Sequence, residues 1–387
     1  MTAKRTTWGL KVAYVLLFMS VGITLPFLPG YFGALGLSGA QVGVLLAVGP
    51  SLAMVLPPMW GQFADRTGRG GMVLVVLCVG GAAGYGLLAL ADGFWGALVG
   101  LALYHVFGSS LTSQLDSLAL HHVQATRRSY VSLRLWGSVG FVVSTLSFGL
   151  MARGLDRLVV LIPLALVATM AGWTAVTLAR EPPRIEVGPH PGFGAVKALV
   201  QRRDVALFLA ATALHWIACA PYHGLLTLHV TKLGWSLSTV GLASAVAVSS
   251  EVLVMVTWPR WGARRPPREM LAWAFGASAV RWLILSVADR PAMIVMAATL
   301  HGLTFGAFYL AAVASMTARV PSSLRATGQS LFAAATFGAG GLIGFAGSGW
   351  LYDVLGGHRL FAVAAAAEAL PLLAIWLADR RPASLAV

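Results

Sequence analysis

The sequence has few charged residues and very little cysteine. Charged side chains make up 10% of the 387 residues and hydrophobic ones 58%, a balance that excludes a soluble globular domain of this length. The two cysteines, Cys78 and Cys219, each lie inside an apolar stretch, which argues against a disulfide and against a cysteine-rich metal site. We therefore expect an all-α membrane protein that needs no metal and no cofactor.

Apolar runs long enough to cross a membrane recur along the whole chain. A helix needs about 20 apolar residues to cross the hydrocarbon layer. Runs such as 72–90 and 158–178 are largely apolar on every side, which indicates helices embedded in lipid. We predict twelve spans: 8–29, 41–64, 71–91, 95–121, 129–151, 158–179, 205–230, 237–258, 270–288, 292–318, 326–351 and 360–378.

The basic residues are distributed unequally between the two sides of this topology. Five of the 27 lysines and arginines fall in outward connections and two, Arg134 and Arg281, inside spans, if the N-terminus is cytoplasmic. The other 20 then face inward, as the positive-inside rule requires. We expect a bacterial-type inner-membrane protein with both termini in the cytoplasm. The same distribution accounts for the net charge of +14 without nucleic acid.

One connection is much longer than the others. Residues 180–204 contain Pro182, Pro183, Pro189 and Pro191 and separate two sets of six spans. The pair Trp60-Gly61 after the second span recurs as Trp261-Gly262 after the eighth, which favours an internal duplication. We predict an N-terminal six-helix bundle at 1–179, a cytoplasmic linker at 180–204 and a C-terminal six-helix bundle at 205–387. Parallel repeats of this kind place a binding site between the halves.

The connection after the second span carries a recognisable motif. It reads Gly-Gln-Phe-Ala-Asp-Arg-Thr-Gly-Arg from residue 61 to residue 69 and resembles the signature loop of the major facilitator superfamily. The resemblance implies two pseudo-symmetric six-helix bundles that transport by alternating access. We expect a conformational latch at Gly61, Asp65, Arg66, Gly68 and Arg69, in which Asp65 takes a helix N-terminus or a basic partner.

Shorter stretches resemble the phenylpropionate permease subgroup, which is itself similar to the lactose permease. They lie at 25–29, 36–38, 134–138, 251–253, 280–282 and 300–302. The resemblance implies a proton-coupled symporter of a small organic solute such as an aromatic acid, a sugar or a nucleoside. It implies lipid and protons as partners, and we expect a monomer.

Two other classes of function remain as alternatives. An exporter or antiporter of drugs or metabolites would share the superfamily, but such antiporters usually carry a Gly-Pro element in the fifth span, and 134–151 has no proline. A membrane enzyme or a sensor is a weaker alternative. The sequence shows no nucleophile elbow, no phosphate loop and no attached soluble domain.

Three polar residues of the C-terminal half lie at similar depth in the membrane. Glu251, Arg281 and His301 are each about 13 to 18 Å from a membrane face at 1.5 Å per helical residue. A charged residue inside a span costs about 3 kcal/mol, so such residues are usually paired and functional. We assign proton coupling to Glu251, with Arg281 as its counter-ion and His301 beside it. The alternative is a static ion pair that fixes helix packing.

A second acid–base pair lies in the N-terminal half. Asp116 and Arg134 are about equally far from the cytoplasmic ends of neighbouring spans, so a helical hairpin would bring them to one level. The resemblance to the lactose permease suggests substrate contact, and a cytoplasmic latch is the alternative. We add four polar residues as substrate contacts because the superfamily lines its cavity with these spans: His105, Gln114, Trp216 and Thr304. Glu368 has no evident partner in its span, and we assign it no coupling role.

Overall fold

The structure, a computed structural model, describes residues 3–126, 129–179 and 193–378. Every regular element in those ranges is helical. The greater part of the predicted linker, residues 180–192 with its four prolines, lies outside the described residues, as do Arg127, Arg128, Arg380 and Arg381. Helix α9 (Phe193–Gln201) occupies the end of the predicted linker.

The chain divides into two compact units. Unit 1 comprises residues 1–188 and 223–245, and unit 2 comprises residues 189–222 and 246–387. Residues 223–245 therefore group with the N-terminal part of the chain, although the sequence analysis placed them in the C-terminal bundle. The predicted bundle boundaries at 179 and 205 stay a prediction.

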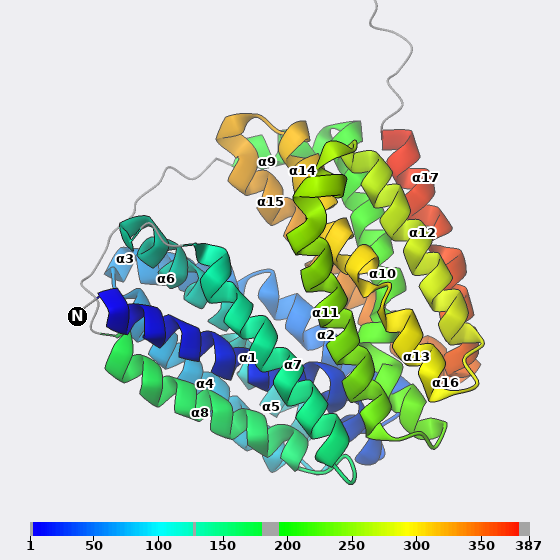
Figure 1. Ribbon diagram of the computed structural model, residues 1–387, viewed down its shortest axis with the longest axis horizontal. Coiled ribbons are helices and arrows are strands. Elements are labelled where there is room, and N and C mark those ends of the chain that lie inside the picture. The colour runs from blue at the N-terminus through cyan, green and yellow to red at the C-terminus, as the bar shows by residue number, and fades with distance from the viewer. Residues whose placement is uncertain (1–2, 127–128, 180–192, 379–387) are drawn as a thin grey trace, which may run out of the picture. The chain divides into compact units, whose positions relative to one another are not determined.

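Eight helices and parts of two others form unit 1. Within it, α1 packs against α7 and α8, α4 against α5 and α8, and α2 against α5 (Figure 1). Figure 1 shows these helices running alongside one another. The eight are α1 (Ala3–Ala34), α2 (Gly39–Ala53), α3 (Leu56–Thr67), α4 (Gly70–Ala89), α5 (Phe94–Gly108), α6 (Leu111–Thr126), α7 (Tyr130–Met151) and α8 (Leu158–Thr177).

Unit 2 is built around α12 (Pro267–Ser286), which packs against α14, α16, α17 and the π-helix η2. Its apolar core includes Phe208, Phe275, Phe308 and Phe332. Helices α10 and α11 contribute to both units. The remaining elements are α10 (Arg203–Lys232), α11 (Leu237–Trp261), α13 (Pro291–Ala298), η2 (Gly302–Ala307), α14 (Phe308–Arg319), α15 (Arg325–Ala333), the π-helix η4 (Ala334–Ala339), α16 (Gly340–Ala367) and α17 (Ala369–Ala378), with short 3₁₀ turns η1 (Gly262–Arg264) and η3 (Ser322–Leu324).

The helices account for the predicted membrane spans. Ten helical segments of the described chain are long and apolar enough to cross a membrane. One of them, Arg325–Ala378, has 54 residues and contains two passes, and α12 adds a pass that those ten omit. Helix α12 carries Arg268, Glu269 and Arg281, which make it less apolar than those ten segments. Counted this way, the described chain has the twelve passes that the sequence predicts.

Two glycines make the sharp turns that these passes need. Gly356 has a φ of 74° and separates the two passes within Arg325–Ala378. Gly68 ends α3 with a φ of 63°, so that α4 begins two residues later. Left-handed backbone costs a residue with a Cβ about 1–2 kcal/mol, which explains glycine at both turns.

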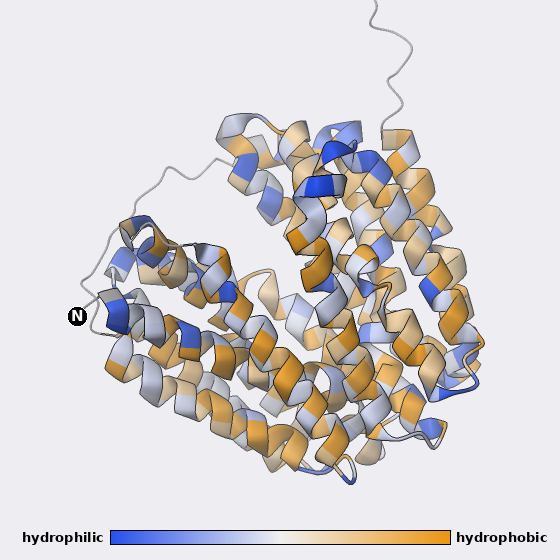
Figure 2. Cartoon of the chain, viewed as in Figure 1, coloured by the Kyte–Doolittle hydropathy of each residue, from blue (hydrophilic) through white to orange (hydrophobic). Residues whose placement is uncertain are grey.

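Apolar side chains cover the outer surfaces of the helices. Large hydrophobic residues such as Trp95 and Met151 are 74% and 79% exposed. Figure 2 shows hydrophobic residues along the helix lengths and hydrophilic ones mostly near helix ends. A hydrocarbon environment explains this exposure, because water would oppose it.

Candidate functional site

The predicted proton-coupling residues meet in unit 2 around Arg281. This arginine of α12 is completely buried, and its Nη1 donates to His301 Nδ1 at 2.9 Å and to Thr304 Oγ1 at 3.0 Å. Its guanidinium carbon lies 3.9 Å from the ring centre of Tyr222, a cation–π distance. We call Glu251, Arg281, His301 and Thr304 the Arg281 cluster.

His301 lies between the arginine and the acid. Because an arginine only donates, His301 Nδ1 must accept, and in a neutral imidazole the proton then sits on Nε2. That nitrogen is 3.7 Å from Glu251 Oε2. The side chain of Glu251 is 21% exposed and that of His301 is 8% exposed. In the chain of contacts from Arg281 through His301 to Glu251, the carboxylate is therefore the most accessible group. The structure thus brings together the three residues to which we assign proton coupling.

A close approach between α11 and η2 puts Glu251 in this place. Ser250 Oγ accepts from the backbone N–H of Gly302 at 2.9 Å. A Cβ at Gly302 would lie 2.5 Å from the Ser250 carbonyl oxygen, so only glycine allows this contact. The π-helical turn that begins at Gly302 also carries Thr304, and π-helical turns are frequent at functional sites.

The other edge of the Arg281 guanidinium makes no hydrogen bond to a described residue. Among the described residues, neither Nε nor Nη2 of Arg281 has a hydrogen bond, although both atoms are buried. Buried polar groups are rarely left unsatisfied, and such groups in a native protein require an explanation. These two N–H groups point in parallel and match the two oxygens of a carboxylate.

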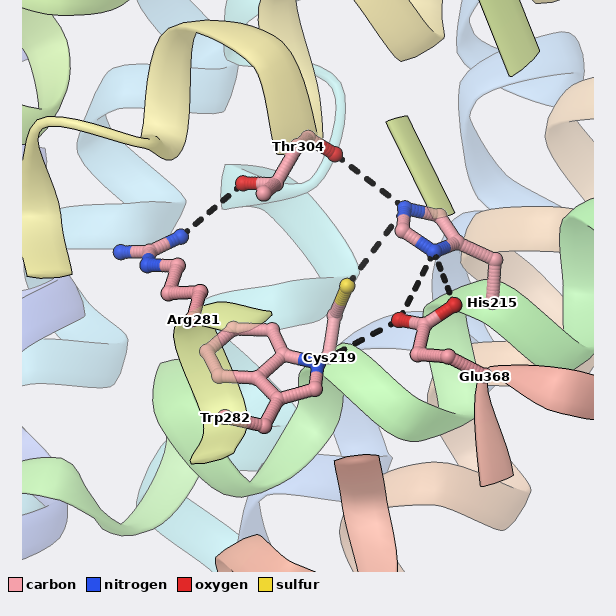
Figure 3. Close-up of polar contacts among 6 residues, drawn as sticks. All are labelled: His215, Cys219, Arg281, Trp282, Thr304 and Glu368. Atoms are coloured by element: carbon pink, nitrogen blue, oxygen red, sulfur yellow. Dashed lines mark hydrogen bonds and ion pairs between the residues drawn. The ribbon is translucent and has the colours of Figure 1, made fainter. Parts of the chain in front are cut away.

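Next to this cluster lies a buried acid–base pair that the sequence analysis missed. Glu368, at the C-terminal end of α16, is hydrogen-bonded to His215 Nδ1 of α10 at 2.9 and 3.0 Å and accepts from Trp282 Nε1 at 3.3 Å (Figure 3). His215, Trp282 and Glu368 are all completely buried. Glu368 therefore has a partner, in contrast to our expectation. Since an acid inside a span needs one, searching the other spans for an unassigned base would have suggested His215.

In unit 1, Asp116 and Arg134 lie close together as predicted. Arg134 Nε is 4.0 Å from Asp116 Oδ1, and the two side chains are 33% and 28% exposed. The hydroxyl of Tyr14 donates to the same oxygen of Asp116 at 2.6 Å. The Arg134 guanidinium also lies 4.1 Å from the ring centre of Phe18. The geometry supports an acid–base pair, and its contact with substrate stays a prediction.

The other predicted contact residues have different surroundings. His105 lies near α2, where a Cβ at Gly49 would come within 2.7 Å of its ring. Trp216 packs against Phe305 and Phe337, with ring centres 5.9 and 4.8 Å apart.

Gln114 differs because its amide is already used within unit 1. Its Nε2 donates to the Gly70 carbonyl oxygen at 3.3 Å and so ties α6 to the start of α4. Its contact with substrate stays a prediction, but this bond gives Gln114 a structural use.

The predicted latch residues form the turn from α3 to α4. Gly61, Asp65 and Arg66 lie on α3, Gly68 caps it, and Arg69 precedes α4. The Gly68 N–H donates to the Asp65 carbonyl at 3.3 Å. A pocket beside this turn is lined by residues of α1, α3, α4, α6 and the end of α8: Thr6, Leu10, Ala64, Asp65, Gly68, Gly70, Gly71, Gln114, Ser117, Leu118, His121, His122 and Leu178.

Comparison with known proteins identifies the family. The family model described as the MFS_1 like family matches residues 7–363. The chain belongs to this family. This MFS_1-like protein is 31% identical over 367 residues to the maltose permease of Geobacillus stearothermophilus, covering 92% of the chain and 88% of that relative. It is 28% identical over 375 residues to the probable 3-phenylpropionic acid transporter of Escherichia coli K12, covering 94% and 96%.

Solved structures of transporters share the fold. The crystal structure of the nucleoside transporter NupG matches with a TM-score of 0.87, at 18% identity, over 97% of this chain and 100% of that one. An auto-inhibited POT family peptide transporter matches with a TM-score of 0.77, at 14% identity, over 98% of each chain. The MFS_1-like protein is thus a multi-pass membrane transporter of small molecules and not an enzyme. The predicted superfamily and fold are confirmed.

Proposed function

We propose that this MFS_1-like protein is a proton-coupled symporter that imports a small organic solute across a bacterial inner membrane. It works as a monomer with both termini in the cytoplasm, by rocking of bundle 1–179 against bundle 205–387. The observation that carries the proposal is the Arg281 cluster, where a buried guanidinium with two N–H groups that make no hydrogen bond to the described residues adjoins a protonatable acid.

Charge balance explains how one proton and one solute would bind together. With Glu251 ionised, its negative charge offsets Arg281 through His301, which lies 2.9 Å from the guanidinium and 3.7 Å from the carboxylate. A proton on Glu251 removes that negative charge and leaves Arg281 buried without a counter-ion, which is costly. A carboxylate of the solute then restores neutrality at the Nε and Nη2 edge, which makes no hydrogen bond to the described residues. Proton and anion therefore favour each other's binding.

Unit 1 would supply the remaining contacts. We propose that Asp116 and Arg134 either bind polar groups of the solute or latch the cytoplasmic side, with His105 and Gln114 as further contacts. In unit 2, Trp216 would stack on a planar or sugar-like part of the solute. The α3–α4 turn, with Gly61, Asp65, Arg66, Gly68 and Arg69, would act as the conformational latch.

The solute can be identified by comparing three candidates, each from a class of compound that a relative's or neighbour's name mentions. We would measure uptake of 3-phenylpropionate, maltose and uridine into proteoliposomes with and without an imposed pH gradient. The Nε and Nη2 groups of Arg281, which lack a hydrogen bond to the described residues, favour the carboxylate among them. If the pH gradient instead drives the solute out of the vesicles, the protein is an exporter.

The coupling role is tested with Glu251→Gln. This variant should keep solute exchange and lose uphill accumulation, because its amide cannot bind the proton. The control is Glu269→Gln, which removes a carboxylate that is 39% exposed and bound to Arg265 at 2.7 Å. If Glu251→Gln accumulates solute as well as the control does, the coupling role is wrong.

A further inference from the structure

The pair formed by His215 and Glu368 has features that a packing contact does not need. His215 is packed between Phe275 and Phe308, with ring centres at 4.9 and 4.4 Å, and Cys219 lies one turn along the same helix. Both members of the pair are completely excluded from solvent. An isolated charge would be very unfavourable in such a place, so its protonation state is tightly constrained. We call these two residues the His215 dyad.

The hydrogen bonds of the dyad specify how many protons it holds. Nδ1 of His215 faces the Glu368 carboxyl at 2.9 Å, and Nε2 faces the Thr304 carbonyl oxygen at 3.1 Å. A carbonyl oxygen only accepts, so Nε2 must carry a proton. Nδ1 and the carboxyl must then share a second proton, because without it the lone pair of Nδ1 would face a negatively charged carboxylate. The dyad therefore holds two protons, as imidazolium and carboxylate or as imidazole and carboxylic acid, and both forms have zero net charge.

We propose that the His215 dyad is a second proton-binding site, separate from Glu251, which loads and releases the shared proton. Release would leave one N–H for two acceptors, since both Glu368 and the Thr304 carbonyl need a donor from the same ring. Either the carboxylate, which keeps its bond from Trp282 Nε1, or the carbonyl then loses its bond to His215. The transition costs one buried hydrogen bond and one buried charge, and it changes the contacts of η2.

Thr304 connects this site to the Arg281 cluster. Its carbonyl accepts from His215 and its hydroxyl accepts from Arg281 Nη1 at 3.0 Å (Figure 3). Releasing the Thr304 carbonyl would therefore shift the group that holds the guanidinium. Among the described residues, the titratable and charged groups near the dyad are Cys219 on α10, 3.6 Å from Nε2, and Arg281 on α12 on the far side of Thr304.

A proton fits these donors better than a metal ion does. His215, Cys219 and Glu368 place their ligand atoms within 4.8 Å of one another. However, the carboxylate lies on the Nδ1 side of the ring and the thiol on the Nε2 side, so one ion cannot bind a ring nitrogen and both other ligands. The bond from Trp282 Nε1 to Glu368 further occupies the carboxylate.

Proton occupancy can be measured without knowing the solute. We would record ¹⁵N spectra of histidine-labelled carrier in nanodiscs, and infrared spectra of its protonated carboxyl groups, over a pH titration. His215 is assigned from the signal lost in His215→Asn. The wild type should show either a doubly protonated His215 or a protonated Glu368. Glu368→Gln should lose one titrating proton and leave His215 singly protonated, whereas Trp282→Phe should keep the shared proton. A wild type in which His215 stays neutral and Glu368 stays ionised over the whole titration, or in which the shared proton is never released, would overturn the proposal.

The transport role of the dyad rests on the proposed symport and has its own readout. Glu368→Gln should lower accumulation in a pH gradient while solute exchange continues, with Glu269→Gln as control. Accumulation at the control level, normalised to folded carrier, would make the dyad a structural pair. Failure of Glu251→Gln to uncouple transport would instead refute the coupling role of Glu251 and leave the spectroscopic result for the dyad intact.

Discussion

The acid–base groups of unit 2 and those of unit 1 differ in burial and in bonding. In unit 2, Arg281, His215 and Glu368 are completely buried, and Thr304 joins Arg281 to His215 through hydrogen bonds of 3.0 and 3.1 Å. His301 bonds Arg281 at 2.9 Å, and only Glu251, at 21%, is partly exposed among these groups. In unit 1, Asp116 and Arg134 are about one third exposed and 4.0 Å apart.

This difference indicates where a change of charge has consequences. Inside a dry cluster, adding or removing one proton leaves a charge or a polar group without compensation, and the neighbouring helices must respond. A partly exposed pair is screened by water and responds weakly. Unit 2 is therefore better suited to energy coupling, and unit 1 to contacts that form and break easily.

The largest effect should come from Arg281→Lys. Lysine keeps the positive charge, but its single ammonium group cannot donate to His301 and Thr304 and also bind a carboxylate through two parallel hydrogen bonds. We expect loss of transport and destabilisation of about 3–5 kcal/mol, the usual cost of breaking a buried charged network. Uptake in proteoliposomes and thermal unfolding in detergent would check this.

The matched control is Arg290→Lys, the same exchange at an arginine whose side chain is 72% exposed. It should be close to wild type in both measurements. Equal behaviour of the two variants would remove the contrast between buried and exposed groups on which the comparison rests.

A smaller effect is expected from Thr304→Val, which separates the two halves of the unit 2 network. Valine keeps the carbonyl that His215 bonds but removes the hydroxyl that accepts from Arg281. We expect about 1–3 kcal/mol of destabilisation and weaker coupling between proton and solute.

Accumulation ratios at two external pH values would measure the coupling effect of Thr304→Val. Thr299→Val is the control, because Thr299 is exposed. Within the described chain, its hydroxyl donates only to the Met296 carbonyl one turn earlier. An accumulation ratio equal to that of the control at both pH values would show that Thr304 does not link Arg281 to the dyad.

The sequence predicts the fold and the Arg281 cluster well because both depend on regular spacing. Span lengths follow from apolar runs, and residue depth follows from the rise per helical residue. Counting residues along the spans is therefore enough to place positions 251, 281 and 301 at one level. The pairing of Asp116 with Arg134 follows from the same arithmetic.

The missed features depend on helix rotation and on local distortion. The bond between His215 and Glu368 forms only if two helices far apart in sequence turn the faces that carry these residues toward each other. The depth of a residue in the membrane does not determine that rotation. The double use of Thr304 depends on the π-helical turn at 302–307, and no residue pattern in the sequence indicated it. The bond of Gln114 to Gly70 likewise depends on how α6 meets α4.

The smallest effect on stability should come from Asp116→Asn, which tests the unit 1 side of the comparison. A partly exposed ion pair contributes about 0–1 kcal/mol, and asparagine can still accept from the Tyr14 hydroxyl. Unfolding should therefore shift no more than in Asp92→Asn, whose pair with Arg157 is 2.9 Å long and 57% and 84% exposed. Solute affinity distinguishes the two proposed roles, because losing a substrate contact lowers affinity whereas losing a latch changes the exchange rate at unchanged affinity. Destabilisation as large as that of Arg281→Lys would show that exposure is not what separates the two units.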